Sequence, residues 1–290
     1  MLPARFEYHR VSTLAEAFAL LDALGDDAKI LAGGQSLIPM MKLRFASPGH
    51  LIDINGVPGL AGAKVDGDVL KIGALTRHND VAASDVIREV HPTISEAAPQ
   101  IADPLVRNLG TIGGSLAHAD PGGDIGSVML ALGARVVAQS SKGEREIGIR
   151  EFLKDTFQTT LRPDEILTEI RVPIAKGENG GAYLKLERKI GDYATVGVAS
   201  FLEFSNGAIG RAGVGLTSVG LINVQATTAE QALAGQEPSR ELFARAGDLA
   251  AEAANPVGDV RGSVDYKRHM VKVYTERGLA AAAASAGKTI

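Results

Sequence analysis

The sequence has no cysteine and no tryptophan among its 290 residues. Without thiolates the chain has no disulfide and no cysteine nucleophile, and it cannot ligate an iron–sulfur cluster through cysteine. It also lacks a run of about 18 apolar residues, the length typical of a membrane-spanning helix. Its first residues, Met1–Arg5, do not form the apolar core of a signal peptide. We therefore expect a cytoplasmic protein with no transmembrane segment.

A strong charge of one sign is absent as well. The 30 basic and 34 acidic residues leave a formal net charge of −4, and lysine and arginine form no cluster. Such a surface argues against nucleic acid as the main partner. With 45% apolar and 22% charged residues, the chain has the composition of a globular protein with room for two or three subdomains.

Patterns of direct catalysis are missing too. No carboxylate pair, catalytic triad, Walker loop or G-x-G-x-x-G fingerprint emerges, so the sequence predicts neither a catalytic residue nor a Rossmann site. The histidines show no metal-ligand spacing such as H-x-x-x-H, and no metal site is predicted; they stand at positions 9, 50, 78, 91, 118 and 269. We interpret His118 as a surface or satisfied core histidine rather than a catalytic one.

The first pattern that is present is strand–helix–strand, in residues 1–57. Thr13 and Glu16 form a capping-box pattern that begins a helix, and Gly25 ends that helix. Two further strands flank a short helical stretch, which makes the strand pair parallel; they are predicted at 28–31 and 50–54. A glycine- and proline-containing boundary then closes this first subdomain.

Residues 58–175 are predicted to form a second subdomain. It opens with a hairpin that turns at Asp66-Gly67. Helices are predicted at 79–84, 93–102 and 125–132, and strands at 135–138, 146–149 and 165–172. The glycine-rich stretch 176–181 is the clearest linker in the chain.

Residues 178–290 are predicted to form a C-terminal subdomain. Three strands, two of them joined by a turn at Asn206-Gly207, are predicted at 182–189, 194–204 and 208–216. Helices follow at 228–234, 239–254 and 264–284. Because strands and helices are segregated along the chain, the whole protein is placed in the α+β class.

Two glycine-containing segments carry the strongest functional signal. Ala32–Ser36 reads Ala-Gly-Gly-Gln-Ser between a strand and a helix, and Thr111–Ser115 reads Thr-Ile-Gly-Gly-Ser. Glycine lets a ligand approach the backbone closely, and free N–H groups at a helix start attract phosphate. The first segment alone fits an ordinary strand-to-helix turn equally well. Together, the two segments could hold the two phosphates of one dinucleotide.

Three side chains elsewhere are candidates for ligand contact. Asp124 could accept a hydrogen bond from a ligand hydroxyl or cap the helix that follows it, and the two roles are not exclusive. Tyr193 could stack on a flat ligand, although a tyrosine at the edge of the core accounts for it better on the sequence alone. Lys185 points away from the face of its neighbouring leucines, toward either solvent or a phosphate.

At the two glycine segments the chain resembles the flavoprotein (medium) subunits of molybdenum hydroxylases, the xanthine oxidase family. The resemblance covers essentially the whole chain. Its further matching runs are Pro39–Arg44, Ile101–Asp103, Val106–Asn108, Glu169–Pro173, Tyr183–Leu186 and Gly191–Ala194. Within the family, Met40–Ala46 is most similar to the branch that oxidises carbon monoxide aerobically.

The resemblance implies a vanillyl-alcohol-oxidase-type (PCMH-type) FAD-binding fold of two subdomains, followed by a C-terminal α+β subdomain with a three-stranded antiparallel sheet. It implies non-covalent FAD, because covalently flavinylated relatives in the wider fold often carry histidine where this chain has Gln35. In the family both glycine loops bind the pyrophosphate through backbone N–H groups. Asp124 matches a position near the ribityl and ribose hydroxyls, Tyr193 packs on the isoalloxazine, and Lys185 lies close to the cofactor. Carried over by motif, the cofactor-binding residues are Ala32, Gly33, Gly34, Gln35, Ser36, Leu37, Ala102, Thr111, Gly113, Gly114, Ser115, Asp124, Leu167, Lys185 and Tyr193.

The resemblance also implies a division of labour. A large partner subunit oxidises the substrate at its molybdenum cofactor, and the expected substrate is carbon monoxide (CO + H2O to CO2). Electrons then pass through 2Fe–2S clusters on a small partner to the FAD of this chain, and on to a quinone, NAD or oxygen. The expected assembly is a cytoplasmic dimer of heterotrimers. As part of this complex, the chain could lie at the inner face of the membrane. The missing cysteines fit clusters held elsewhere.

Three alternatives stay open at this stage. The chain could be the same subunit of an aldehyde or N-heterocycle dehydrogenase, because those relatives share most of the motifs. It could be a self-sufficient FAD oxidoreductase. That enzyme would need a catalytic base or a hydride-accepting geometry in the C-terminal subdomain, and the sequence offers no better candidate than His118. It could also be a nucleotide-binding scaffold without redox work, which should bind ADP-like ligands as well as FAD.

Overall fold

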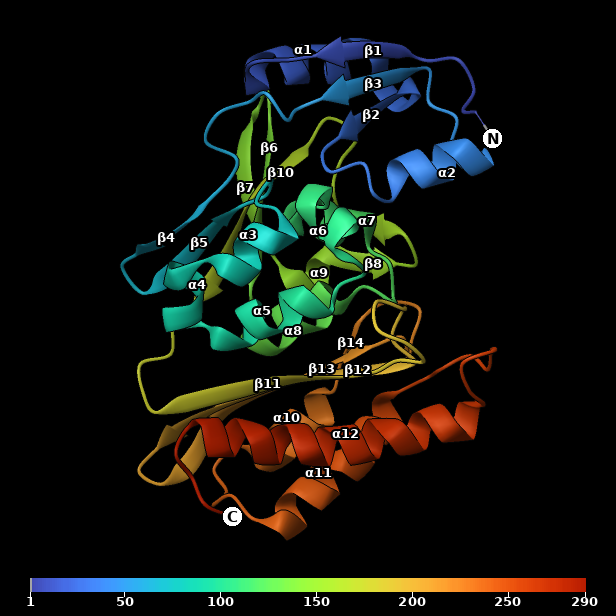
Figure 1. The fold of residues 1–290 in the computed structure, drawn as a ribbon. Coiled ribbons are helices and arrows are strands. Elements are labelled where there is room, and N and C mark those ends of the chain that lie inside the picture. The colour runs from blue at the N-terminus through green and yellow to red at the C-terminus, as the bar shows by residue number, and fades with distance from the viewer. Residues whose placement is uncertain (1) are drawn as a thin grey trace.

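The computed structural model describes residues 2–290 and shows three layers stacked along the molecule (Figure 1). A small sheet from the N-terminal residues lies at one end, a five-stranded sheet with a group of helices forms the middle, and a four-stranded sheet backed by helices forms the other end. The largest buried cluster joins Ala199 and Phe201 of the last sheet to the apolar residues of the middle layer. The α+β class is confirmed.

The N-terminal layer is a parallel sheet in the order β1-β3-β2. Its elements are β1 (Glu7–Arg10), α1 (Leu14–Leu24), η1 (Gly25–Asp27), β2 (Ala28–Leu31), α2 (Leu37–Leu43) and β3 (His50–Asp53). Thr13 Oγ1 accepts a hydrogen bond from the Glu16 N–H at 3.2 Å, which confirms the predicted cap. The expected parallel pair, β2 and β3, is present. β1 adds a third strand, which was not predicted because its sequence shows no alternation of apolar and polar residues.

The middle layer is an antiparallel sheet in the order β4-β5-β10-β6-β7. Its strands are β4 (Ala63–Asp66), β5 (Val69–Gly73), β6 (Arg135–Ser140), β7 (Gly143–Gly148) and β10 (Ile166–Pro173), with a small separate pair, β8 (Leu153–Asp155) and β9 (Gln158–Thr159). Its helices are α3 (His78–Ala83), α4 (Asp85–Val90), α5 (Pro92–Ala97), η2 (Ala98–Gln100), α6 (Pro104–Leu109), α7 (Ile112–His118), α8 (Asp124–Leu132) and α9 (Ile149–Phe152).

The predicted helix 93–102 is wrong at its end. Helical structure stops at Gln100, and Ala102 adopts a left-handed φ of 46°. Asp103 then caps the next helix, with its Oδ1 accepting hydrogen bonds from the N–H groups of Leu105 and Val106. A new N-cap needs extended backbone, so the earlier helix cannot continue through this point.

The C-terminal sheet has four strands in the order β11-β12-β13-β14. The expectation of three strands is therefore wrong by one. The strands are β11 (Asn179–Leu186), β12 (Val196–Ser205), β13 (Ala208–Thr217) and β14 (Val224–Gln225), and the helices are α10 (Thr227–Leu233), α11 (Arg240–Ala253) and α12 (Val264–Ser285). The extra strand spans two residues, too few to show an alternating pattern. The predicted linker 176–181 is also shorter than expected, because its last three residues begin β11.

The wholly buried helix α8 lies between the middle and C-terminal layers (Figure 1). Thr217 Oγ1 on β13 donates to Ser127 Oγ on α8 at 2.6 Å, within the buried interface. Asn223 Nδ2 donates to the Gly123 carbonyl at 3.0 Å, just before α8 begins. These bonds hold the start of α8 against the C-terminal sheet, next to the cleft described below.

Candidate cofactor-binding cleft

A cleft of about 560 Å³ opens where the N-terminal layer, the middle helices and a C-terminal loop meet. This volume lies within the range of about 300–1,000 Å³ that is usual for small-molecule and cofactor sites. Every cofactor-binding residue expected from the sequence lines it, although those residues come from all three layers. They are Ala32, Gly33, Gly34, Gln35, Ser36, Leu37, Ala102, Thr111, Gly113, Gly114, Ser115, Asp124, Leu167, Lys185 and Tyr193.

The first glycine segment is an open loop between β2 and α2. Among residues 2–290, none of the backbone N–H groups of Gly33, Gly34, Gln35 and Ser36 has an acceptor. Backbone donors without a partner in the chain need water or a ligand. Four such donors in succession beside a cleft suit an anionic group with several acceptor oxygens, such as phosphate.

The second glycine segment is not a loop. Its residues form α7, with Thr111 as the N-cap, and Thr111 Oγ1 accepts from the Gly114 N–H at 3.1 Å. The N–H groups of Gly113 and Ser115 donate to the carbonyls of Ala74 and Thr111, each at 2.9 Å. The expectation that both segments offer free N–H groups to a pyrophosphate is therefore wrong for this one, because helix formation and the Ala74 carbonyl use these donors.

Glycine is required at position 33 because the two segments pack against each other. A Cβ on Gly33 would lie 2.3 Å from the Leu109 carbonyl oxygen, which is too close for any side chain. Leu109 lies two positions before the second segment. The close approach of the backbones, and not only access for a ligand, explains this glycine.

A polar contact also joins the two segments. Arg77 donates to the Leu109 carbonyl and, at 2.6 Å, to Asn55 Oδ1. Asn55 Nδ2 in turn donates at 2.8 Å to the carbonyl of Ala32, at the start of the first segment. No motif marked Arg77 or Asn55 in the sequence, because the contacts cross from one layer to another.

A buried charged group lies on the C-terminal side of the cleft. Lys185 Nζ lies 3.0 Å from Asp124 Oδ2 and donates to the Gln100 carbonyl at 2.8 Å, and Tyr183 donates through its hydroxyl to Asp124 Oδ1 at 2.5 Å. The Lys185 side chain is 1% exposed, so the solvated alternative for this lysine is wrong. Glu187 Oε2 lies 3.5 Å from Lys185 Nζ and adds a second negative charge.

Asp124 does not cap α8, since Gly123 is the N-cap and no side chain makes a capping bond there. Burial raises the pKa of the Asp124 carboxyl, while Lys185 and the Tyr183 hydroxyl act in the opposite direction. Burial and the neighbouring Asp124 charge raise the pKa of Tyr183 well above its usual range, so Tyr183 acts as a hydrogen-bond donor. The group presents a fixed carboxylate, held by two donors, at the cleft wall.

Tyr193 lies at the rim of the cleft with its side chain largely exposed. The Arg261 guanidinium lies 5.8 Å from the centre of its ring and donates to Asp192 Oδ1 at 2.8 Å. Arg188 holds the other Asp192 oxygen at 3.0 Å. The loop that carries Tyr193 is thus fixed by two arginines, while Tyr193 itself stays more than half exposed.

Two histidines, His78 and His118, line the cleft in different surroundings. His78 is buried, its Nδ1 has no partner within residues 2–290, and burial together with the nearby Arg107 charge lowers its pKa to about 4. His118 packs on Phe157 with ring centroids 4.9 Å apart, and burial lowers its pKa as well. His78 was missed in the sequence because a single histidine outside any motif gives no signal.

The fold and the cleft define a cofactor-binding domain joined to a second α+β unit. The FAD binding domain in molybdopterin dehydrogenase matches residues 4–175, and the CO dehydrogenase flavoprotein C-terminal domain matches residues 181–282. The chain belongs to this family of FAD-containing oxidoreductase subunits.

Similar proteins cover the chain from end to end. The carbon monoxide dehydrogenase medium chain of Hydrogenophaga pseudoflava is 43% identical over 97% of this chain and 98% of its own length. A subunit alpha of the 6-hydroxypseudooxynicotine dehydrogenase complex of Paenarthrobacter nicotinovorans is 40% identical over 97% of this chain and 96% of its own length. A solved carbon monoxide dehydrogenase from Hydrogenophaga pseudoflava contains a chain with a TM-score of 0.96 and 44% identity, with 98% of this chain and 99% of that chain covered.

The cleft fits the cofactor of this family. The unpartnered N–H groups of Gly33–Ser36 provide donors for phosphate, and the unpartnered Nδ1 of His78 provides a further polar group in the lining. Among residues 2–290, no helix combines the length and apolarity needed to cross a bilayer.

Proposed function

We propose that the chain is the electron-transfer subunit of a molybdenum hydroxylase complex. It takes electrons from 2Fe–2S clusters on a small partner and passes them to a quinone, NAD or oxygen. A large partner oxidises the substrate at its molybdenum cofactor. The observation that carries the proposal is the cleft itself, which gathers phosphate donors, a buried carboxylate and an exposed aromatic ring from three separate layers. Bound FAD would supply the exchange between one-electron and two-electron carriers.

We assign the cofactor contacts as follows. The N–H groups of Gly33–Ser36 bind the pyrophosphate, and the Asp124 carboxylate accepts from hydroxyls of the ribityl or ribose. Tyr193, which is exposed at the rim of the cleft, packs its ring on the isoalloxazine. Lys185 acts through Asp124, because its ammonium group is already bound to the Gln100 carbonyl and Asp124. Binding is non-covalent.

We propose carbon monoxide as the substrate of the large partner. The supporting observation is 43% identity over nearly the whole chain to a carbon monoxide dehydrogenase medium chain. The alternative is an N-heterocycle or aldehyde substrate. It is supported by the relative from a 6-hydroxypseudooxynicotine dehydrogenase complex, at 40% identity, and by a glyceraldehyde dehydrogenase medium chain, at 36% identity. We further propose a cytoplasmic dimer of heterotrimers, with subdomains 1–57, 58–175 and 178–290 in this chain.

The test is native purification of the chain with whatever binds it, followed by an absorption spectrum, metal analysis and assays with carbon monoxide, aldehydes and N-heterocycles. We expect acid-released FAD, a large partner with molybdenum, a small partner with iron, and reduction of the flavin by carbon monoxide. A flavin-bearing chain that turns over an organic substrate alone would overturn the proposal in favour of a self-sufficient oxidoreductase. Equal affinity for ADP and FAD would favour a scaffold without redox work.

A further inference from the structure

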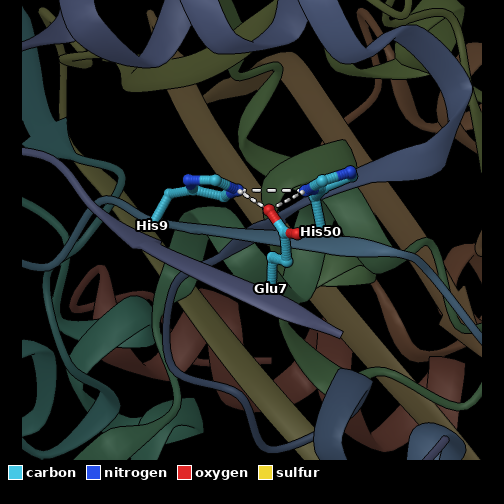
Figure 2. A group of neighbouring side chains, drawn as sticks. All are labelled: Glu7, His9 and His50. Atoms are coloured by element: carbon cyan, nitrogen blue, oxygen red, sulfur yellow. Dashed lines mark hydrogen bonds and ion pairs between the residues drawn. The ribbon is translucent and has the colours of Figure 1, made fainter. Parts of the chain in front are cut away.

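A cluster of three potential metal ligands lies on the N-terminal sheet, outside the cofactor cleft (Figure 2). Glu7 and His9 are two residues apart on β1 and so lie on the same face of the sheet. His50 is the register partner of Glu7 on the adjacent parallel strand β3. The register therefore places all three side chains together, although His50 is some forty positions away in the sequence.

The three ligand atoms have the spacing that a small cation requires. His9 Nε2 and His50 Nδ1 are 3.0 Å apart, and Glu7 Oε2 lies 3.5 Å from His50 Nδ1 and 3.9 Å from His9 Nε2. Tetrahedral ligands at Zn–N and Zn–O bond lengths of about 2.0–2.1 Å lie about 3.3–3.4 Å from one another. The observed separations bracket that value, so an ion could bind all three atoms with small side-chain movements.

We propose that Glu7, His9 and His50 form a binding site for a divalent cation of the zinc type, with the fourth position open to water. Two imidazoles and one carboxylate suit Zn²⁺ and its late first-row neighbours better than Mg²⁺ or Ca²⁺, which prefer oxygen ligands. The histidine side chains are 27% and 20% exposed, and that of Glu7 is 73% exposed, so an ion can reach the site from solvent.

A fourth residue supports the site from outside. Asp27 Oδ2 lies 3.8 Å from His50 Nε2, the ring nitrogen that would not bind the ion. Carboxylates in this position orient a ligating histidine and raise its basicity. The Gly49 N–H holds Asp27 Oδ1 at 2.9 Å, and a Cβ on Gly49 would lie 2.3 Å from Asp27 Oδ2. Glycine at position 49 thus leaves room for the carboxylate.

A bound ion would connect β1 to β3. β1 is an edge strand of four residues and is the first element of the chain. Metal that binds the folded chain, and not the unfolded one, stabilises the fold. The alternative is a plain hydrogen bond between the two imidazoles with no ion, and it predicts no effect of zinc.

The experiment is a zinc titration of the full chain against a chromophoric chelator, with cobalt absorption as a second readout. We expect one Zn²⁺ per chain and the visible absorption of tetrahedral Co²⁺. His9→Ala and His50→Ala should each weaken zinc binding by at least the roughly 10- to 100-fold that loss of a supporting outer-shell partner costs. Glu7→Gln should weaken it as well. His269→Ala removes an exposed histidine on α12 and should change nothing.

A thermal melt with and without zinc guards against variants that merely unfold. Zinc should raise the melting midpoint of the parent chain and of His269→Ala, but not that of the His9→Ala/His50→Ala double variant, whose midpoint without zinc should match the parent. The proposal is overturned by the absence of stoichiometric zinc binding, by zinc stabilisation that survives in the double variant, or by equal loss of binding in His269→Ala.

Discussion

Arg77 donates a hydrogen bond of 2.6 Å to Asn55, and this contact joins the N-terminal sheet to the helices of the middle layer. Through Asn55 it reaches the Ala32 carbonyl, and through its other nitrogen it reaches the Leu109 carbonyl. The two glycine segments are therefore held together by side chains that lie outside both of them. Anything that loosens this contact should change the shape of the cleft.

Replacement of Arg77 by methionine tests that contact. A hydrogen bond from a charged donor contributes about 1.5–3 kcal/mol, and about 1.4 kcal/mol corresponds to a tenfold change in affinity. We expect Arg77→Met to weaken FAD binding about tenfold, as measured by flavin fluorescence titration. Arg88→Met removes an exposed ion pair with Asp85 on α4 and is the matched control. Unchanged FAD affinity in Arg77→Met would show that the contact does not shape the cleft.

Replacement of Gly33 by alanine tests the close approach of the two segments. The new Cβ would overlap the Leu109 carbonyl oxygen, so the backbones must separate. Overpacking of this kind costs about 1–3 kcal/mol. We expect a lower melting temperature together with a loss of bound FAD. Gly258→Ala, whose Cβ would have no neighbour closer than 3.7 Å, should leave both quantities unchanged. A stable Gly33→Ala variant with normal flavin content would contradict the packing argument.

The features of the fold that the sequence predicts are those that depend on residues close together in the chain. The cap at Thr13 and the turn at Asn206-Gly207 depend on neighbouring residues, and both predictions are confirmed. The first hairpin is also present, but Asp66 pairs with Val69, so its turn lies at Gly67-Asp68, one residue later than predicted. The exposed strand β1 and the two-residue strand β14 gave no periodic pattern and were missed.

In the candidate site, too, local motifs could be predicted from the sequence, whereas contacts between distant residues could not. Motif resemblance pointed to residues that the structure gathers in one cleft, but it mistook α7 for an open loop because adjacent glycines usually mark turns. Pairings between layers, such as Arg77 with Asn55, and the Glu7–His9–His50 cluster depend on strand register and chain packing. A linear sequence does not display these relationships.

Replacement of Tyr193 by alanine tests the proposed stacking. Tyr193 is 57% exposed, so removal of its side chain should change the free energy of unfolding of the flavin-free chain by no more than about 0.5 kcal/mol. Aromatic contacts contribute about 0.5–1.5 kcal/mol beyond burial, which predicts a several-fold loss of FAD affinity and a shifted flavin spectrum. Tyr193→Phe should retain both. An equal loss in Tyr193→Phe would assign the effect to the hydroxyl instead of the ring.

Replacement of Lys185 by methionine tests the buried pair with Asp124. Removal of one partner of a buried pair costs about 3–5 kcal/mol, because the other charge is left unpaired. The Asp124 pKa, already raised by burial, should rise further. Protonation of Asp124 relieves the cost, so the loss of stability should be smallest near about pH 4, the ordinary pKa of an aspartate, and should grow by up to about 1.4 kcal/mol per pH unit above it. The double variant Lys185→Met/Asp124→Asn should remove this pH dependence. A loss that is independent of pH would contradict the argument.

Buried His78 should impose a pH dependence of the opposite sign. Its folded-state pKa of about 4 lies below the usual value of 6.5, so the unfolded chain takes up the proton first as the pH falls. Stability is therefore fully present above about pH 6.5 and is lost toward pH 4, by at most about 3 kcal/mol at about 1.4 kcal/mol per unit. Denaturant unfolding of the parent chain and of His78→Phe across this range measures the effect. The parent chain should lose stability relative to His78→Phe as the pH falls, because phenylalanine takes up no proton in either state. A constant difference across the range would show that His78 is protonated in the folded chain as readily as in the unfolded one.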